Sequence, residues 1–260
     1  MLIGAMNHPA HDLLEEIAWM AGLGLGFIDL TLEPPAAAAW KVDPEAIRAR
    51  LRRHGMEVVG HTAYYLPLCS PFESLRKAAV AELEVCLEAF ARIGAKWMNI
   101  HPDRHAAMHP REFIIQKNIE SIRALLPLSR RLGVGLMIEN LPGDFNTASQ
   151  LGELLDPIPE LGLHLDIGHS NLMVSPNSAP EILAKYGSRL RHVHLHDNKG
   201  GSADLHLPLG TGNVDVASNL RALRKTGYDG TITLEVFSPD RHFFEYSRDV
   251  LRRMWDEIGA

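Results

Sequence analysis

The sequence predicts an α/β protein built as a closed parallel (β/α)8 barrel. Short apolar runs alternate with longer amphipathic stretches along all 260 residues. The Gly-rich fingerprint of an open doubly wound sheet does not follow the first run, where Asn7-His8-Pro9 stands instead. No composition shift or long linker marks a boundary, so we expect a single domain over residues 1–260.

Each predicted strand is a short apolar run that ends at a polar residue or a turn signal. Leu25-Gly-Phe-Ile-Asp-Leu-Thr31 is typical, because β-branched and aromatic residues precede the turn-forming Glu33-Pro-Pro. In chain order the predicted strands are residues 2–5, 25–31, 57–61, 97–101, 135–139, 161–166, 190–195 and 231–236.

The predicted helices carry apolar residues three or four positions apart. Asp43-Pro44 and Ser70-Pro71 are start signals, since Asp or Ser caps a first turn and proline suits its first position. In chain order the predicted helices are residues 13–21, 44–54, 74–93, 110–132, 148–155, 180–186, 216–225 and 244–258.

The composition, 46% apolar and 22% charged with a net charge of −6, is that of a soluble globular protein. No apolar run approaches the roughly 20 residues of a membrane span. Cys69 and Cys86 lack paired spacing and are expected as free thiols, a disulfide between them being the alternative. The N-terminus lacks a secretory pattern, so we expect a cytoplasmic protein. The acidic balance disfavours a domain-wide footprint for nucleic acid.

Side chains able to do chemistry end nearly every predicted strand, where parallel barrels gather their active sites. These side chains are His61, His101, Glu139, Asp166 with His169, His194 and Glu235. The loop after the seventh strand adds Asp204-Leu-His206, whose two polar side chains share a face if the segment is extended. So many imidazoles and carboxylates crowd unfavourably unless cations bind them. Mixed nitrogen and oxygen donors favour zinc, manganese or iron.

The other histidines carry weaker signals. His164 and His192 share the inward face of their strands with Asp166 and His194 but lie deeper, which predicts supporting roles. His196 stands just past a strand end, and its role is left open. We expect solvated side chains at His8, His11, His54, His105, His109 and His242.

The segment His194-Leu-His-Asp-Asn-Lys-Gly200, with Asp204-Leu-His206-Leu-Pro-Leu-Gly210-Thr-Gly-Asn213 after it, resembles the metal-binding signature of the xylose isomerase-like TIM barrel superfamily. This superfamily includes sugar isomerases and epimerases and the endonuclease IV-type apurinic-site nucleases. Ile138-Glu139-Asn140, Asp166-Ile-Gly-His169 and Leu234-Glu235 extend the resemblance over essentially the full length.

The resemblance implies one to three divalent cations per chain, held by nine residues. The first set implied is His61, His101 and Glu139, the second is Glu139, Asp166, His194 and Glu235, and the third is His169, Asp204 and His206. The isomerase and epimerase branch needs only the second set, with Glu139 and Glu235 as acid and base.

Two functions are open. The favoured one is isomerisation or epimerisation of a small sugar or sugar phosphate through a metal-stabilised enediolate. The alternative is cation-dependent cleavage of DNA at apurinic sites. The loop from Glu33 to Lys41 lacks arginine and looks like an apolar lid over a small molecule, which favours the first function.

We expect the small-molecule substrate to contact Trp40, Tyr64, Asn140 and Lys199. A homodimer is an option that the resemblance implies, although the sequence shows no legible interface.

Overall fold

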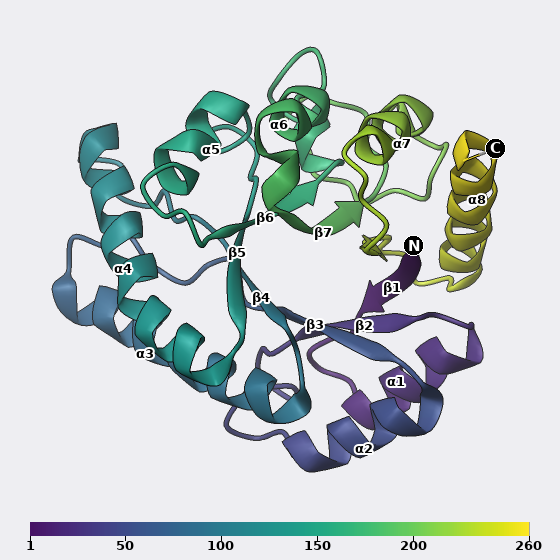
Figure 1. Ribbon diagram of the computed structural model, residues 1–260, viewed down its shortest axis with the longest axis horizontal. Coiled ribbons are helices and arrows are strands. Elements are labelled where there is room, and N and C mark those ends of the chain that lie inside the picture. Colours follow the sequence, from purple (N-terminus) through teal and green to yellow (C-terminus); the bar gives the residue numbers. More distant parts are fainter. Residues whose placement is uncertain (260) are drawn as a thin grey trace. The chain divides into compact units, whose positions relative to one another are not determined.

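The structure, a computed structural model, describes residues 1–259. Within this range eight parallel strands alternate with eight α-helices, in the order of a closed barrel (Figure 1). The strands are β1 Leu2–Met6, β2 Phe27–Thr31, β3 Glu57–His61, β4 Trp97–Ile100, β5 Gly135–Glu139, β6 Gly162–Asp166, β7 Leu190–Leu195 and β8 Thr231–Leu234. The fold class expected from the sequence is confirmed.

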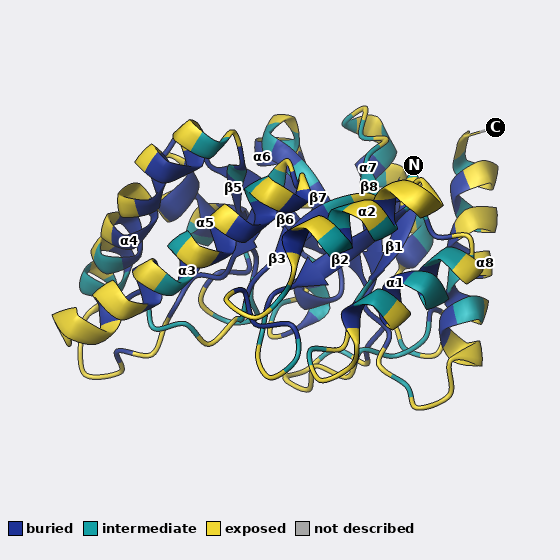
Figure 2. Ribbon diagram, turned by 90° about the horizontal axis from the view of Figure 1, so that it is seen from below, coloured by how far each residue is buried: buried dark blue, intermediate teal, exposed yellow. Residues whose placement is uncertain are grey.

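The helices also lie where the apolar periodicity places them. They are α1 Leu13–Gly22, α2 Pro44–His54, α3 Glu73–Ile93, α4 Arg111–Leu132, α5 Ala148–Leu155, α6 Ala179–Tyr186, α7 Val216–Lys225 and α8 His242–Gly259. Each helix presents a buried stripe and an exposed stripe, whereas the strands are almost wholly buried (Figure 2). None of the helices in the described range is both long and apolar enough to span a membrane.

Contacts divide the chain into two compact units. The N-terminal unit comprises Met6–Glu139 and Gly152–Gly162. The C-terminal unit comprises Met1–Ala5, Asn140–Leu151 and the chain from Leu163 onward. The single-domain organisation stays a prediction.

In the N-terminal unit, β2 pairs with β3 from Phe27↔Glu57 to Thr31↔His61, and β4 pairs with β5. Gly60 of β3 lies against helix α3, since a Cβ there would come within 2.9 Å of the Phe90 ring. Cys69 and Cys86 are both buried and free, as expected.

The two start signals behave differently. Asp43 caps α2 by accepting hydrogen bonds from the amides of Glu45 and Ala46, with Pro44 at the first helical position. The start expected at Ser70-Pro71 is wrong, because α3 begins at Glu73 after Phe72. The Ser70 hydroxyl instead accepts a hydrogen bond from the Phe72 amide at 3.2 Å. Ser70 therefore closes a local turn before the helix and does not cap its first turn.

In the C-terminal unit, β7 lies between β6 and β8, and β8 pairs with β1. The register sets Asp166 opposite His194 and His194 opposite Thr233. The polar residues that end these strands therefore lie side by side at one level of the sheet. This arrangement forms the candidate site of this unit.

Candidate metal and active site

Three residues expected at the first cation lie together in the N-terminal unit. His61 and Glu139 end β3 and β5, and His101 follows β4 directly. His101 Nε2 lies 2.9 Å from Glu139 Oε2, and His61 Nε2 lies 3.9 Å from the same oxygen. All three are buried. One donor atom from each falls within 4.8 Å of the others, which suits a shared cation.

Two neighbouring polar groups orient this cluster. Asn99 donates from Nδ2 to Glu139 Oε2 at 2.7 Å, and its Nδ2 lies 3.2 Å from His101 Nε2. Thr31 Oγ1 lies 3.4 Å from His61 Nδ1. The sequence reasoning missed Asn99, although its position two residues before His101 on β4 places it on the same inward face.

The C-terminal unit brings together Asp166, His194 and Glu235. His194 Nδ1 lies 3.2 Å from Glu235 Oε2 and 4.0 Å from Asp166 Oδ2. Asp166 and His194 are fully buried, and Glu235 is 8% exposed. These are three of the four residues expected at the second cation.

Asn140 holds the end of β6 in place. Its Oδ1 accepts from the Asp166 amide at 2.7 Å, and its Nδ2 donates to the Asp166 carbonyl at 3.0 Å. The Asp166 carboxylate in turn accepts from the His169 amide at 2.8 Å, which starts the short 3-10 turn His169–Asn171. Asn140 thus positions Asp166, and its contact with substrate stays a prediction.

The third expected set also converges. His169 Nε2 and His206 Nε2 each lie 3.1 Å from Asp204 Oδ2. The segment is not regularly extended, since His206 has a φ of 45°, a conformation that favours glycine and is uncommon in other residues. Burial would raise the pKa of Asp204, but the close contacts with the two histidines outweigh burial and hold that pKa well below its ordinary value.

Asp197, to which the sequence reasoning assigned no role, organises the loop that carries Asp204 and His206. Its Oδ1 accepts from the amides of Asn198 and Val214, and its Oδ2 accepts from those of Gly210 and Gly212, at 2.8 to 3.0 Å. Gly212 is required here, because a Cβ would come within 2.1 Å of the Asn198 carbonyl oxygen.

The family model for the xylose isomerase-like TIM barrel matches residues 17–254. The chain belongs to this family. The resemblance read from the metal-binding signature is confirmed at that level.

Among the proteins similar to the chain are two relatives and one solved structure. An uncharacterised protein of Methanocaldococcus jannaschii is 29% identical over 192 residues, which cover 70% of this chain and 65% of that protein, just under two thirds of its length. L-ribulose 3-epimerase of Methylomonas sp. (strain DH-1) is 37% identical over 255 residues, covering 92% of this chain and 83% of the relative. A crystal structure of a D-tagatose 3-epimerase-like protein superimposes with a TM-score of 0.88 at 23% identity, covering 100% and 98% of the two chains, and shows the shared fold.

Divalent cations, which the family resemblance implies, fit the residues present. Buried donor atoms form close groups within each unit, including Asp166, His169 and His196 in the C-terminal unit. Such groups place carboxylate oxygens and imidazole nitrogens within bonding reach of one ion, and a cation offsets the crowding of like charge. The donors are nitrogen and oxygen, which matches zinc, manganese or iron.

Eight histidines outside the three sets have the exposure or burial that the sequence predicts. His8, His11, His54, His105, His109 and His242 are all exposed. His164 and His192 are fully buried. The ring nitrogens of His192 lie 2.7 and 3.0 Å from the hydroxyls of Thr231 and Thr233, so this imidazole is held by the barrel core.

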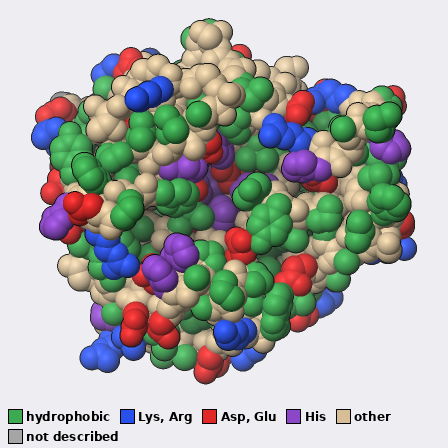
Figure 3. All heavy atoms as spheres, turned by 180° about the vertical axis from the view of Figure 1, so that it is seen from behind, with side chains coloured by type: hydrophobic (Ala, Val, Ile, Leu, Met, Phe, Trp, Pro, Cys, Tyr) green, Lys and Arg blue, Asp and Glu red, His purple; other side chains and the backbone are tan. Residues whose placement is uncertain are grey.

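Three of the four residues expected to meet substrate reach the surface, whereas the fourth, Asn140, is fully buried. Trp40 and Tyr64 are 63% and 64% exposed, and the Tyr64 ring lies 6.5 Å from the His101 ring. Lys199 is exposed, and its carbonyl accepts from Asn213. Hydrophobic and histidine side chains both reach the surface on the face shown in Figure 3.

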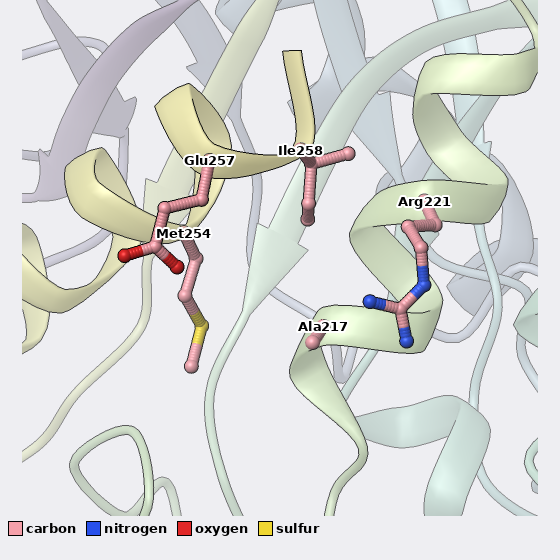
Figure 4. Close-up of a pocket in the computed structure, with 5 residues that line it drawn as sticks. All are labelled: Ala217, Arg221, Met254, Glu257 and Ile258. Atoms are coloured by element: carbon pink, nitrogen blue, oxygen red, sulfur yellow. The ribbon is translucent and has the colours of Figure 1, made fainter. Parts of the chain in front are cut away.

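A separate surface pocket lies between α7 and α8 in the C-terminal unit (Figure 4). Its lining residues are Ala217, Arg221, Met254, Glu257 and Ile258. None of the nine expected cation ligands lines it, so we do not assign it to the active site.

Proposed function

We propose that the protein is a metal-dependent sugar isomerase or epimerase, with 3-epimerisation of a ketose as the leading reaction. The observation that carries the proposal is the 37% identity, over 92% of this chain, to a protein named L-ribulose 3-epimerase. The buried donor sets in both units support it, because this chemistry needs carboxylates and a cation site together.

The reaction removes a proton from a carbon beside a carbonyl group and returns a proton to the opposite face. When bound, the cation supplies Lewis-acid polarisation of the adjacent substrate oxygens, which acidifies that carbon. In the C-terminal unit Asp166, His194 and Glu235 would hold the cation, as their burial and mutual contacts favour.

Glu139 and Glu235 are the proposed proton-transfer residues. Asn99 donates to Glu139 Oε2 and so fixes the orientation of that carboxylate. His194 fixes Glu235 in the same way, at 3.2 Å. A positioned carboxylate can accept the proton on one face of the substrate while the other supplies one.

Trp40 and Tyr64 are proposed to cover the substrate. Both rings are more than half exposed, so each has a face available to a small molecule. Lys199 is the proposed cationic contact for a substrate oxygen or phosphate. Asn140 acts beside them through the backbone of Asp166.

The proposal is tested with the purified full chain, stripped of metal and reloaded with Mn²⁺, Co²⁺ or Zn²⁺. A panel of ketopentoses and ketohexoses is followed by chromatography for the epimer, and by NMR in D₂O for exchange of the hydrogen on carbon 3. We expect Glu139→Gln and Glu235→Gln each to lower kcat by about 10²- to 10⁴-fold. Glu257→Gln, which changes an exposed glutamate of α8, is the matched control.

Exchange separates the two glutamates. If each handles one face, a single Gln variant stops epimer formation but still exchanges the hydrogen of the epimer that the remaining glutamate serves. Loss of both exchanges in one variant contradicts the two-glutamate assignment. Absence of turnover by the loaded protein on every ketose contradicts the epimerase proposal.

One observation favours phosphodiester hydrolysis as a second candidate. The third set, which the nuclease branch uses and the epimerase branch does not need, is intact, with both imidazoles 3.1 Å from Asp204. Nicking of an abasic-site duplex at low salt, lost on Glu139→Gln, would establish this function in place of the first.

A further inference from the structure

Three imidazoles, not two, surround Asp204. Besides His169 and His206, His196 places its Nε2 3.5 Å from Asp204 Oδ1. The same Nε2 lies 3.5 Å from Asp166 Oδ1. His196 is fully buried, and within the described residues its Nε2 has no hydrogen-bond partner. The resemblance assigns no role to this residue.

The opposite ring nitrogens show which way the lone pairs face. Nδ1 of His169 lies 2.9 Å from the Asn140 carbonyl oxygen, Nδ1 of His206 lies 3.2 Å from that of Glu235, and Nδ1 of His196 lies 3.3 Å from that of Asp197. A carbonyl oxygen only accepts, so each Nδ1 carries its proton. In the neutral rings all three Nε2 atoms then present lone pairs to the Asp204 carboxylate.

Lone pairs that face a carboxylate repel it unless a proton or a cation lies between them. Three protonated imidazoles beside one carboxylate would leave excess positive charge next to the fully buried ring of His196. One divalent cation resolves all three contacts at once. Ligating histidines characteristically donate their other ring nitrogen to a backbone carbonyl, as all three do here. Each of the three Nε2 atoms lies 3.1 to 3.5 Å from an oxygen of Asp204, close to the roughly 3.3 Å between neighbouring ligands around zinc with bonds of about 2.0–2.1 Å. Donor atoms of His196 also lie within 4.8 Å of donors of His169 in one group and of His206 in another.

The backbone makes room for the additional ring. A Cβ on Gly168 would come within 2.2 Å of His196 Nε2, so only glycine admits the imidazole at this place. The strained backbone of His206, with φ of 45°, brings its ring into a stack with His196 at 4.2 Å between centroids. The glycine at position 168 and the positive φ of His206 each cost conformational free energy, and a histidine that only fills space would not require them.

We propose that His196 is a fourth protein ligand, which with His169, Asp204 and His206 closes the third cation site around zinc or a similar ion. Four protein ligands are typical of structural zinc, whereas catalytic zinc keeps one position open. The cation at this site therefore stabilises the loop from Asp197 to Val214 and does not bind substrate.

The test measures metal binding and stability, not turnover. The stripped full chain is titrated with Zn²⁺ against a chromophoric chelator, and Co²⁺ loading is followed by visible absorption, which is more intense for four-coordinate cobalt than for five or six ligands. Unfolding temperature is recorded with and without Zn²⁺. The variants are His196→Asn, which removes the ligand, and Gly168→Ala, which displaces the ring and leaves every ligand in the chain. Leu205→Ala, at an exposed residue between Asp204 and His206, is the control.

We expect both variants to weaken binding of one cation by at least about 10-fold, to lower the cobalt absorption, and to shrink the rise in unfolding temperature on adding Zn²⁺. Leu205→Ala should match wild type. Equal affinity and unchanged cobalt absorption in His196→Asn would overturn the proposal. So would an equal loss of unfolding temperature with and without Zn²⁺, because that result makes the ring a packing element only. Gly168→Ala keeps the test decisive where His196→Asn fails to fold.

Discussion

Replacement of Asp197 by asparagine tests how the candidate site is built. The change keeps the size of the side chain but leaves one oxygen, so an NH₂ group must face two backbone amides whichever way the new amide turns. In the protein each carboxylate oxygen accepts two amides, Asn198 and Val214 on one and Gly210 and Gly212 on the other. We therefore expect two charge-assisted hydrogen bonds to be lost.

The magnitude follows from these contacts. Two hydrogen bonds to a charged group are worth about 3–6 kcal/mol together. Gly210 is exposed and its amide regains water, so we expect a net loss of about 2–4 kcal/mol in the free energy of unfolding. For a chain of this size that corresponds to a fall of roughly 5–15 °C in unfolding temperature.

The assay is urea unfolding and calorimetry of metal-stripped protein, so that cation binding does not contribute. Asp215→Asn is the matched control, because Asp215 caps α7 through one bond to the Ser218 amide and asparagine caps equally well. A change for Asp197→Asn no larger than for this control, within about 0.5 kcal/mol, would refute the reasoning.

Three further perturbations are predicted from the same structure. Gly60→Ala should cost about 1–3 kcal/mol of unfolding free energy in urea titration, because its Cβ meets the Phe90 ring at 2.9 Å; a neutral result would show that the ring moves aside freely. Hydrogen bonding to Arg76 lowers the pKa of Glu73 to about 2, so the stabilisation from this pair is present above pH 4.5 and disappears as the pH falls towards 2. Wild type should exceed Glu73→Gln in stability at pH 6, and the difference should narrow at pH 3; a constant difference would contradict this origin. Removal of metal by chelation should lower the unfolding temperature, and added Zn²⁺ should restore it. At a free Zn²⁺ concentration 100 times Kd the free energy of unfolding should rise by about 2.7 kcal/mol; an unchanged temperature would argue against binding to the folded state.

The element order was predictable because barrel strands and helices differ in period. Runs such as residues 135–139 lack any helical stripe, whereas α3 buries Leu83, Leu87 and Phe90 on one face. Element ends were less predictable where local hydrogen bonds compete. Ser70 is a good capping residue, yet its hydroxyl closes a turn before the helix begins.

The candidate site likewise contains residues that the sequence predicts and residues that it does not. Residues at strand ends, such as His101 and Glu139, could be predicted from sequence alone because parallel strands deliver their ends to one level. Asn99 could also have been predicted, because strand alternation places it on the inward face two residues before His101. Asp197 and His196 were not, because their roles depend on how the loop after β7 returns to meet Gly168 and Asp204, and no periodicity encodes such a return.

His196 bears on the choice between the two chemistries. Hydrolysis of a phosphodiester by closely spaced cations requires each cation to keep a position for a substrate oxygen. His169, Asp204 and His206 alone would leave such a position, and His196 would take it. A closed site of this kind suits an enzyme whose chemistry runs at Asp166, His194 and the glutamates, with the other cation holding the loop. His196→Asn should then create a position for inorganic phosphate at the third cation, so phosphate should change the cobalt absorption of the variant more than that of wild type, where only the catalytic cation keeps an open position. An equal change in the two spectra would show that the third cation site is already open in wild type, and would favour phosphodiester hydrolysis.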